Sequence, residues 1–190
     1  MSNAADLTQS TDEDLAQSAR DGDGRAFELL ATRFERRVFG LCRVVLRDPH
    51  EAADATQEAF LRAYKHLERF DPSRRFAPWI LTIASRVARD MAEKKKPVPQ
   101  SEFAEESRAA EDDPSMVLSD REDLGRLRAA IDQLPERERL AIYLRFVQGV
   151  DPPEVAEAIG VTANNLRVVL CRAKAHLRAI LDATRAARED

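Results

Sequence analysis

Hydrophobic residues recur at steps of three and four along most of the chain, which is the period of amphipathic helices. In the first half, this spacing predicts helices over residues 11–20, 25–47, 50–67 and 77–95. In the second half, it predicts helices over residues 114–133, 135–147, 152–159 and 163–183. The sequence has no clean alternation of apolar and polar residues, so we expect an all-α fold.

Helix-start and helix-stop residues lie at the boundaries of these segments. Thr11 with Asp14 resembles a capping pair, and Asp48-Pro49 ends the second helix. Residues 97–114 are acidic, contain Ser and Pro, and hold few apolar side chains that could offset the entropy lost on ordering. We therefore predict two small helical domains joined by a flexible acidic linker, with bounds 1–96, 97–114 and 115–190.

The apolar stripes identify the side chains that we expect to face the core. In helix 50–67 they are Ala53, Phe60, Leu61, Tyr64 and Leu67. In helix 77–95 they are Trp79, Ile80, Ile83, Val87 and Met91. Cys42 and Cys171 each stand alone within an apolar helical pattern, so we expect two buried small side chains and neither a metal site nor a disulfide.

The distribution of charge changes the conclusion that the total alone would give. The net charge is −4, which argues against a polyanionic partner. Residues 97–123, however, hold nine acidic and two basic side chains, a net charge of −7 that leaves +3 for the rest of the chain. Residues 74–96 and 160–188 are strongly basic. Because the placement of charge decides binding to a polyanion, nucleic acid remains a candidate partner.

The sequence contains no constellation of catalytic residues. His50, His66 and His176 are scattered, without a nearby nucleophile or ligand set, and there is no glycine-rich phosphate loop. We therefore expect no enzymatic activity, no metal, no cofactor and no small-molecule substrate. No signal peptide precedes the first helix, and no apolar run approaches the length of a membrane span. We expect a cytoplasmic protein that does not insert into membranes.

Residues 152–183 have the spacing of a helix-turn-helix unit. Gly160 suits a left-handed turn, and Thr162 resembles the N-cap of the second helix. One side of that helix carries Leu166, Leu170, Ala173, Leu177 and Leu181, and the opposite side carries Asn164, Arg167, Val168, Cys171 and Arg172. Arg and Asn can read base edges in the major groove, whereas Lys174, Arg178 and Arg185 suit phosphates. The alternative is two packed helices with a solvated basic face.

Two further surfaces are candidates for binding. Phe76 and Trp79 are interleaved with the bases of residues 74–96, and aromatic and basic groups together suit unstacked or flipped bases. The alternative is that both aromatic rings belong to the core. In helix 50–67, Asp54, Gln57 and Glu58 form a polar face that could meet a basic partner helix, or could simply be solvated.

Several segments, in this order, resemble the sigma factor family of bacterial RNA polymerase, in its small extracytoplasmic-function group. Residues 48–64 resemble the second conserved region, with its D-x-x-Q-E-x-F core at Asp54 to Phe60. Residues 76–84 resemble the F-x-x-W-L-x-x-I-A motif that follows. Residues 134–139, 154–161 and 172–174 resemble parts of the fourth region. The resemblance covers residues 12–96 and 115–181.

The resemblance implies a promoter-specificity subunit whose partners are core RNA polymerase, through its β′ clamp helices and β, promoter DNA and an anti-sigma factor. It assigns polymerase binding to Asp54, Gln57, Glu58 and Arg62. It assigns opening and reading of the −10 element to Phe70, Arg74, Arg75, Phe76, Trp79, Thr82, Arg86 and Arg89. It assigns reading of the −35 element to Asn164, Asn165, Arg167, Val168, Arg172 and Lys174.

The recognition helix departs from the family pattern. Where Thr-Val-Lys-Ser-Arg-Leu is common, this chain has valines at 168 and 169, which replace a hydroxyl and a cation. Val168 could contact a thymine methyl or a partner protein. Two alternatives follow: a sigma mimic that sequesters an anti-sigma factor without binding DNA, and a helix-turn-helix repressor whose N-terminal domain only dimerises or senses.

Overall fold

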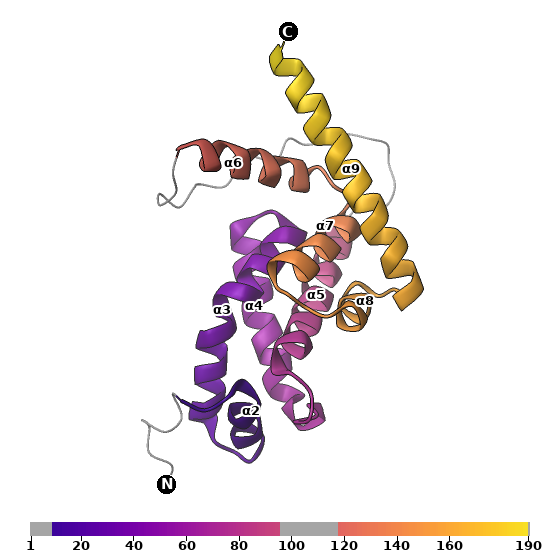
Figure 1. Ribbon diagram of the computed structural model, residues 1–190. Helices are drawn as coiled ribbons and strands as arrows, with labels where there is room; N and C mark the ends of the chain where they lie inside the picture. The colour runs from indigo at the N-terminus through magenta and orange to yellow at the C-terminus, as the bar shows by residue number, and fades with distance from the viewer. Residues whose placement is uncertain (1–8, 96–117, 190) are drawn as a thin grey trace.

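The computed structural model describes residues 9–95 and 118–189 (Figure 1). Its elements are α2 (Asp12–Arg20), α3 (Gly24–Leu46), α4 (Pro49–Lys65), η1 (Leu67–Arg69), α5 (Phe76–Lys95), α6 (Leu118–Asp132), α7 (Glu136–Ile142), η2 (Tyr143–Val147), α8 (Pro152–Ile159) and α9 (Ala163–Glu189). The described residues contain no strand, so the all-α prediction is confirmed. The predicted linker, 97–114, lies outside the described residues.

The predicted capping pair of Thr11 and Asp14 is confirmed, and Asp48, predicted only to end the preceding helix, also caps the start of α4. At α2 the Asp14 amide donates to Thr11 Oγ1 over 3.1 Å, while Asp14 Oδ2 accepts from the Thr11 amide over 3.4 Å. At α4 the Asp48 carboxylate accepts from the His50 and Glu51 amides over 2.8 and 3.0 Å. Because the first amides of a helix have no partner within it, these side chains set where each helix begins.

Two predicted helices in the second half have different bounds. The helix expected over 135–147 divides at Ile142, and Tyr143–Val147 forms a π-helix. Within it, the Tyr143 hydroxyl accepts a 2.8 Å hydrogen bond from Gln148 Nε2 and lies so close to Gly40 of α3 that a Cβ at this position would clash with it. The wider turn therefore accompanies the docking of Tyr143 on α3. The last helix continues to Glu189, beyond the predicted end at 183.

The buried face of α4 is made of small residues. Ala52, Ala55, Thr56, Ala59 and Ala63 are buried. The prediction that Ala53, Leu61 and Tyr64 face the core was wrong, because all three are exposed, whereas Phe60 is partly buried and Leu67 is buried. Four alanines let α4 approach α3 and α5 closely, and the larger apolar residues lie on neighbouring sides of the helix.

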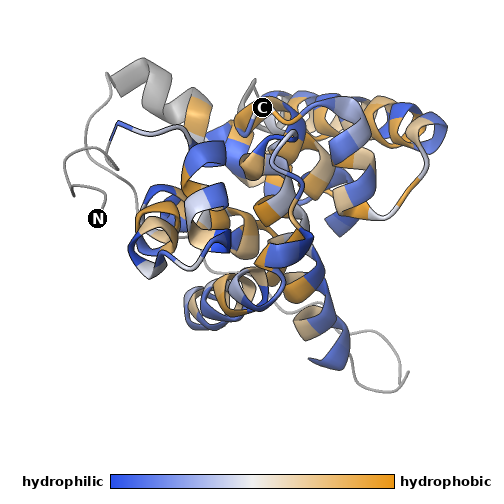
Figure 2. Cartoon of the chain, turned by 90° about the horizontal axis from the view of Figure 1, so that it is seen from below, coloured by the Kyte–Doolittle hydropathy of each residue, from blue (hydrophilic) through white to orange (hydrophobic). Residues whose placement is uncertain are grey.

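The other predicted inner faces are confirmed. In α5, Ile80 and Val87 are buried, and Trp79, Ile83 and Met91 pack partly buried against the core. In α9, Leu166 and Ala173 are buried, and Leu170, Leu177 and Leu181 are partly buried. Figure 2 shows hydrophobic and hydrophilic positions on different sides of the helices, as this division requires. No helix among the described residues is long and apolar enough to cross a membrane.

The helices form two groups that pack against each other, α2–α5 and α6–α9 (Figure 1). Buried residues of α7 and α8, among them Leu140 and Val155, belong to the same core cluster as buried residues of α3 and α5. A smaller cluster around Leu134, Ile142 and Ala173 lies within the second group. The core is therefore continuous between the two predicted domains, although the segment that joins them in sequence is not described.

Two arginines connect the groups through backbone carbonyls. Arg139 of α7 is buried, and its Nε donates to the Val44 carbonyl of α3 over 2.7 Å. Burial lowers the pKa of Arg139 to about 10, so the guanidinium remains charged at neutral pH. In return, Arg47 at the end of α3 donates to the Asp132 carbonyl at the end of α6 over 2.6 Å. Each cation thus satisfies carbonyls at a helix C-terminus of the other group.

Candidate functional site

The outer face of α4 presents the first set of predicted site residues. Asp54 and Gln57 are exposed. Glu58 instead accepts from Arg62 Nε over 2.6 Å, and Arg62 also reaches Asp90 of α5 over 3.4 Å. The Glu58 carboxylate is the main cause of the raised pKa of Arg62. Asp54 and Gln57 are therefore open to a partner, while Glu58 and Arg62 are held in a network that ties α4 to α5.

Two exposed apolar side chains lie beside this polar face. Leu61 is 55% exposed and Tyr64 is 56% exposed, and the Tyr64 ring meets Phe27 of α3 edge-on with centroids 5.0 Å apart. Leu61 follows Gln57 by four residues and Tyr64 follows Leu61 by three, so all three share one side of the helix. Sequence reasoning missed them as site residues, because their apolar character suggested burial; their spacing from Gln57 was the available signal.

An aromatic cluster forms one end of the α2–α5 group. Phe70 and Phe76 are buried, with ring centroids 5.5 Å apart, and Trp79 is 5.2 Å from Phe70 and 5.5 Å from Phe76. Trp79 is only partly buried and lies at the edge of the cluster. Thr82 is buried too, and its hydroxyl donates to the Pro78 carbonyl over 2.8 Å. In this arrangement Phe70, Phe76 and Thr82 are buried and support Trp79 from the core.

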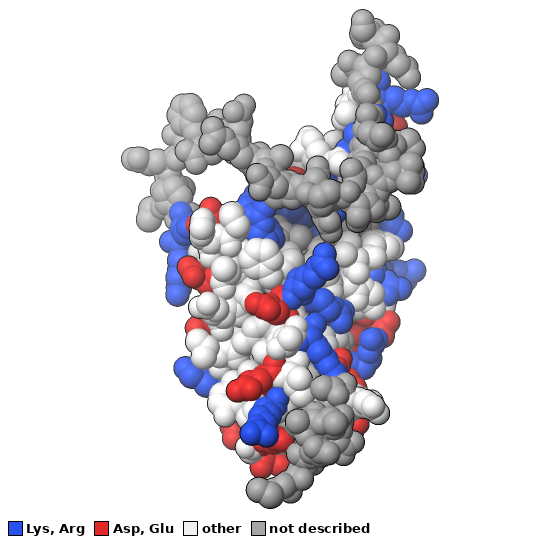
Figure 3. Space-filling view, turned by 90° about the vertical axis from the view of Figure 1, so that its left-hand side faces the viewer, with Lys and Arg blue, Asp and Glu red and all other residues white. Residues whose placement is uncertain are grey.

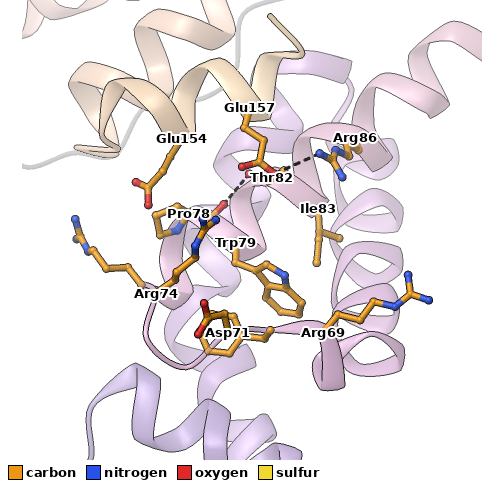
Figure 4. Close-up of a pocket in the computed structure, with 12 residues that line it drawn as sticks. Arg69, Asp71, Arg74, Pro78, Trp79, Thr82, Ile83, Arg86, Glu154 and Glu157 are labelled. Atoms are coloured by element: carbon orange, nitrogen blue, oxygen red, sulfur yellow. Dashed lines mark hydrogen bonds and ion pairs between the residues drawn. The ribbon is translucent and has the colours of Figure 1, made fainter. Parts of the chain in front are cut away.

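Trp79 lines an open cavity of about 270 Å³ between α5 and α8 (Figure 4). The residues around it are Arg69, Phe70, Asp71, Arg74, Arg75, Pro78, Trp79, Thr82, Ile83, Arg86, Glu154 and Glu157. On the α5 side, four arginines accompany the indole ring, a combination that can stack a base and hold its phosphates. The structure thus brings together Arg74, Arg75, Trp79 and Arg86, which the sequence predicted as one set.

Acidic residues of the second group oppose these cations. Arg86 meets Glu157 of α8 at 3.5 Å, Arg75 meets Asp151 at 3.9 Å, and Arg89 meets Glu136 of α7 at 3.9 Å. Figure 4 shows Glu154 and Glu157 extending from α8 over the cavity. Most of these side chains are exposed, so each pair contributes little free energy by itself. Together, however, they cover the surface that sequence analysis assigned to DNA.

Glu154 is the least well satisfied of these acids. Its Oε2 atom is buried and has no hydrogen-bond partner among the described residues. A carboxylate oxygen that has lost water without gaining a donor destabilises the arrangement that buries it. Burial of this oxygen therefore opposes the packing of α8 over the cavity. On the face shown in Figure 3, basic and acidic side chains are likewise interspersed.

The first half of α9 carries the third set of predicted residues. Thr162 Oγ1 accepts from the Asn165 amide over 3.2 Å, which confirms the predicted N-cap. Asn164, Asn165, Arg167, Val168 and Arg172 are all exposed. Lys174 is exposed as well, and its Nζ lies 5.2 Å from the centre of the Phe146 ring. Val169 differs from its neighbour, because it packs partly buried against the core.

The two cysteines have different environments. Cys42 is buried as predicted, and burial raises the pKa of its thiol to about 11. The prediction that Cys171 is buried was wrong, because this residue lies on the exposed side of α9 beside Arg172. His176 bonds the largely buried Glu138 of α7 over 2.7 Å. Within the described residues, no group of His, Cys, Asp and Glu could hold a metal ion.

Comparison with known proteins matches both helical groups. Residues 30–97 match the family described as Sigma-70 region 2, and residues 124–177 match the one described as Sigma-70, region 4. The chain is 30% identical over 178 residues to the RNA polymerase sigma-H factor of Pseudomonas aeruginosa, covering 88% of this chain and 92% of that protein. It is also 30% identical over 179 residues to the ECF RNA polymerase sigma-E factor of Haemophilus influenzae, covering 87% and 93%.

A solved structure shows the same fold across both groups. The structure of CnrH in complex with the cytosolic domain of CnrY matches with a TM-score of 0.67 at 26% sequence identity. The match covers 90% of this chain and 97% of CnrH. The likeness therefore extends over the described helices of both groups and is not confined to the helix-turn-helix unit.

Proposed function

We propose that this chain, which belongs to the extracytoplasmic-function group of RNA polymerase sigma factors, divides promoter recognition between its two helical groups. As a sigma factor, it directs core polymerase to promoters. The observation that carries the proposal is the placement of its exposed predicted DNA contacts on two separate surfaces, the cavity beside Trp79 and the first half of α9. The first surface serves the −10 element and the second serves the −35 element.

Core polymerase binds the outer face of α4 in this proposal. Asp54 and Gln57 supply polar contacts that are open to a basic partner helix. Leu61 and Tyr64 add apolar area beside them, and Glu58 with Arg62 keeps α4 fixed against α5. A patch with apolar centre and polar surroundings is typical of protein interfaces. The partner surface is the clamp-helix segment of the β′ subunit, with β as a further contact.

The −10 surface consists of Arg74, Arg75, Trp79, Arg86 and Arg89. Trp79 offers a stacking face for an unpaired base, and the arginines neutralise phosphates of the separated strand. The acidic partners of Arg75, Arg86 and Arg89 come from α7, α8 and the residue before α8, so movement of the second group away from α5 would release these arginines for DNA. Core polymerase and DNA would favour that separation because they bind only the open arrangement. The buried, unpaired oxygen of Glu154 favours it as well.

The −35 surface is the exposed side of α9, with Asn164, Asn165, Arg167, Arg172 and Lys174 as its polar contacts. Among the described residues Arg167 and Arg172 form no ion pair, so both are available to bases or phosphates. We place the protein in the cytoplasm with polymerase, without catalysis of its own. Because CnrH is solved with a bound protein domain, we also include an anti-sigma partner that holds the closed arrangement.

Run-off transcription tests the proposal. Core polymerase with this protein is applied to a genomic promoter pool, and complex formation with core is measured in parallel. We expect specific transcripts and a stable complex. Formation of a complex without transcripts would favour a sigma mimic. The absence of both the complex and the transcripts would refute the proposal. Arg167→Ala should weaken −35-dependent promoters roughly ten-fold, whereas Arg36→Ala, an exposed arginine of α3, should have little effect.

A further inference from the structure

The outermost line of the recognition helix α9 is nearly apolar. Asn164, Val168, Cys171 and Ala175 follow one another at steps of four, three and four, so they share one side of the helix. All four are exposed, and Val168 is 48% exposed. The opposite side holds the buried Leu166 and Ala173. This line therefore points directly away from the body of the second group.

Polar and basic residues flank the apolar line on both sides. Arg167, Lys174 and Arg178 repeat at steps of seven and four along one edge, and Asn165 and Arg172 lie along the other, seven residues apart. The surface is thus charged at its edges, as a helix lying between two phosphate backbones requires. At its centre, beyond Asn164, the side chains offer no strong hydrogen-bond donor or acceptor.

Given the proposed −35 role of α9, on which this inference rests, we infer that Val168 reads the 5-methyl group of a thymine, with Cys171 and Ala175 completing an apolar strip. In the major groove the thymine methyl is the one apolar feature of the base edges. A valine placed against any other base edge would remove water from polar groups without replacing the hydrogen bonds. The expected −35 element therefore contains a thymine at the position below Val168, between bases contacted by Arg167 and Arg172.

Uracil substitution tests this inference, because deoxyuridine differs from thymidine only by the methyl group. Holoenzyme made with the full chain is first used to select a −35 sequence, and each thymine of the selected duplex is then replaced singly by deoxyuridine. We expect one replacement to weaken binding about four-fold, the effect of one buried methyl group. Val168→Ser should bind the thymine and deoxyuridine duplexes equally. Arg172→Ala should bind both more weakly and keep the four-fold ratio.

Each result decides a different question. If no deoxyuridine replacement weakens binding, Val168 does not read a methyl group and the inference fails. If the four-fold ratio persists in Val168→Ser, another residue reads the methyl and the assignment fails. Both outcomes leave the proposed sigma function intact, because a −35 sequence was selected. A selection that yields no preferred sequence would overturn the −35 role of α9 and the inference together.

Discussion

The Ser85 hydroxyl of α5 donates a 2.8 Å hydrogen bond to the carbonyl of Ala158, near the end of α8. Both groups are buried, and the two residues are 73 positions apart. The bond joins the surface assigned to the −10 element to the first helix of the helix-turn-helix unit. It lies beside the Arg86–Glu157 pair and thus reports whether α8 covers that surface.

Replacing Ser85 by Ala should weaken the closed arrangement. The Ala158 carbonyl would remain buried without its donor, which costs about 1–2 kcal/mol. Urea unfolding followed by circular dichroism measures the free energy of unfolding. Thr32→Ala is the matched control, because the Thr32 hydroxyl bonds only the Glu28 carbonyl of its own helix on an exposed face. An equal loss in both variants would contradict the role given to the Ser85 bond.

Gly40→Ala should separate the two groups by steric conflict. The added methyl would collide with the Tyr143 hydroxyl, and overpacking of this kind destabilises by about 1–3 kcal/mol. Small-angle scattering should show a larger radius of gyration. Adding Tyr143→Phe to Gly40→Ala removes the conflicting oxygen, so this double variant should partly regain the smaller radius of gyration. The control Gly125→Ala on α6, where the added methyl meets open space, should stay compact. An unchanged radius of gyration for Gly40→Ala would count against the packing of Tyr143 on α3.

Neutralising the cover should strengthen −10 binding. The variant Glu157→Gln removes from the cavity beside Trp79 the carboxylate that is paired with Arg86. We expect up to about five-fold tighter binding of a fluorescent single-stranded −10 oligonucleotide, measured by anisotropy, because exposed ion pairs contribute at most about 1 kcal/mol. The gain should shrink at high salt. Glu35→Gln on α3 is the control, and an identical gain there would show a general charge effect.

Leu61→Asp should weaken polymerase binding without unfolding the chain. Leu61 is 55% exposed, so the substitution removes apolar contact area from α4 and adds charge with little effect on the core. We expect at least a roughly ten-fold loss of affinity for a β′ clamp-helix fragment in a pull-down or calorimetric titration. Leu124→Asp, at an exposed leucine of α6, should bind normally. Normal binding by Leu61→Asp would exclude this leucine from the interface.

The two thiols should react at very different rates. Burial raises the pKa of Cys42 to about 11, so its thiol is protonated and inaccessible, whereas Cys171 is exposed on α9. Native protein should incorporate one equivalent of maleimide, which peptide mass mapping should locate at Cys171. Denatured protein should incorporate two equivalents. Bound −35 DNA should slow the labelling of Cys171 if α9 enters the groove. Unchanged labelling in the presence of DNA would indicate that another face of the protein binds.

The features that the sequence determined by itself depend on neighbouring residues. The capping pair of Thr11 and Asp14 and the left-handed Gly160 were predictable, because the physics that sets them acts within a few positions. The period of apolar residues likewise predicted the inner side of α9. The exposed polar residues of α4 and α9 followed from the same period.

Only the tertiary structure decided which surfaces are covered. It buried the alanines of α4 and exposed Leu61, because close packing depends on the shape of the neighbouring helices and not on hydrophobicity alone. It also placed Glu157 over Arg86 and Tyr143 against Gly40. These pairs are far apart in the chain, and no local pattern encodes them. They form because the two groups share one core, which brings acid to base and aromatic ring to glycine.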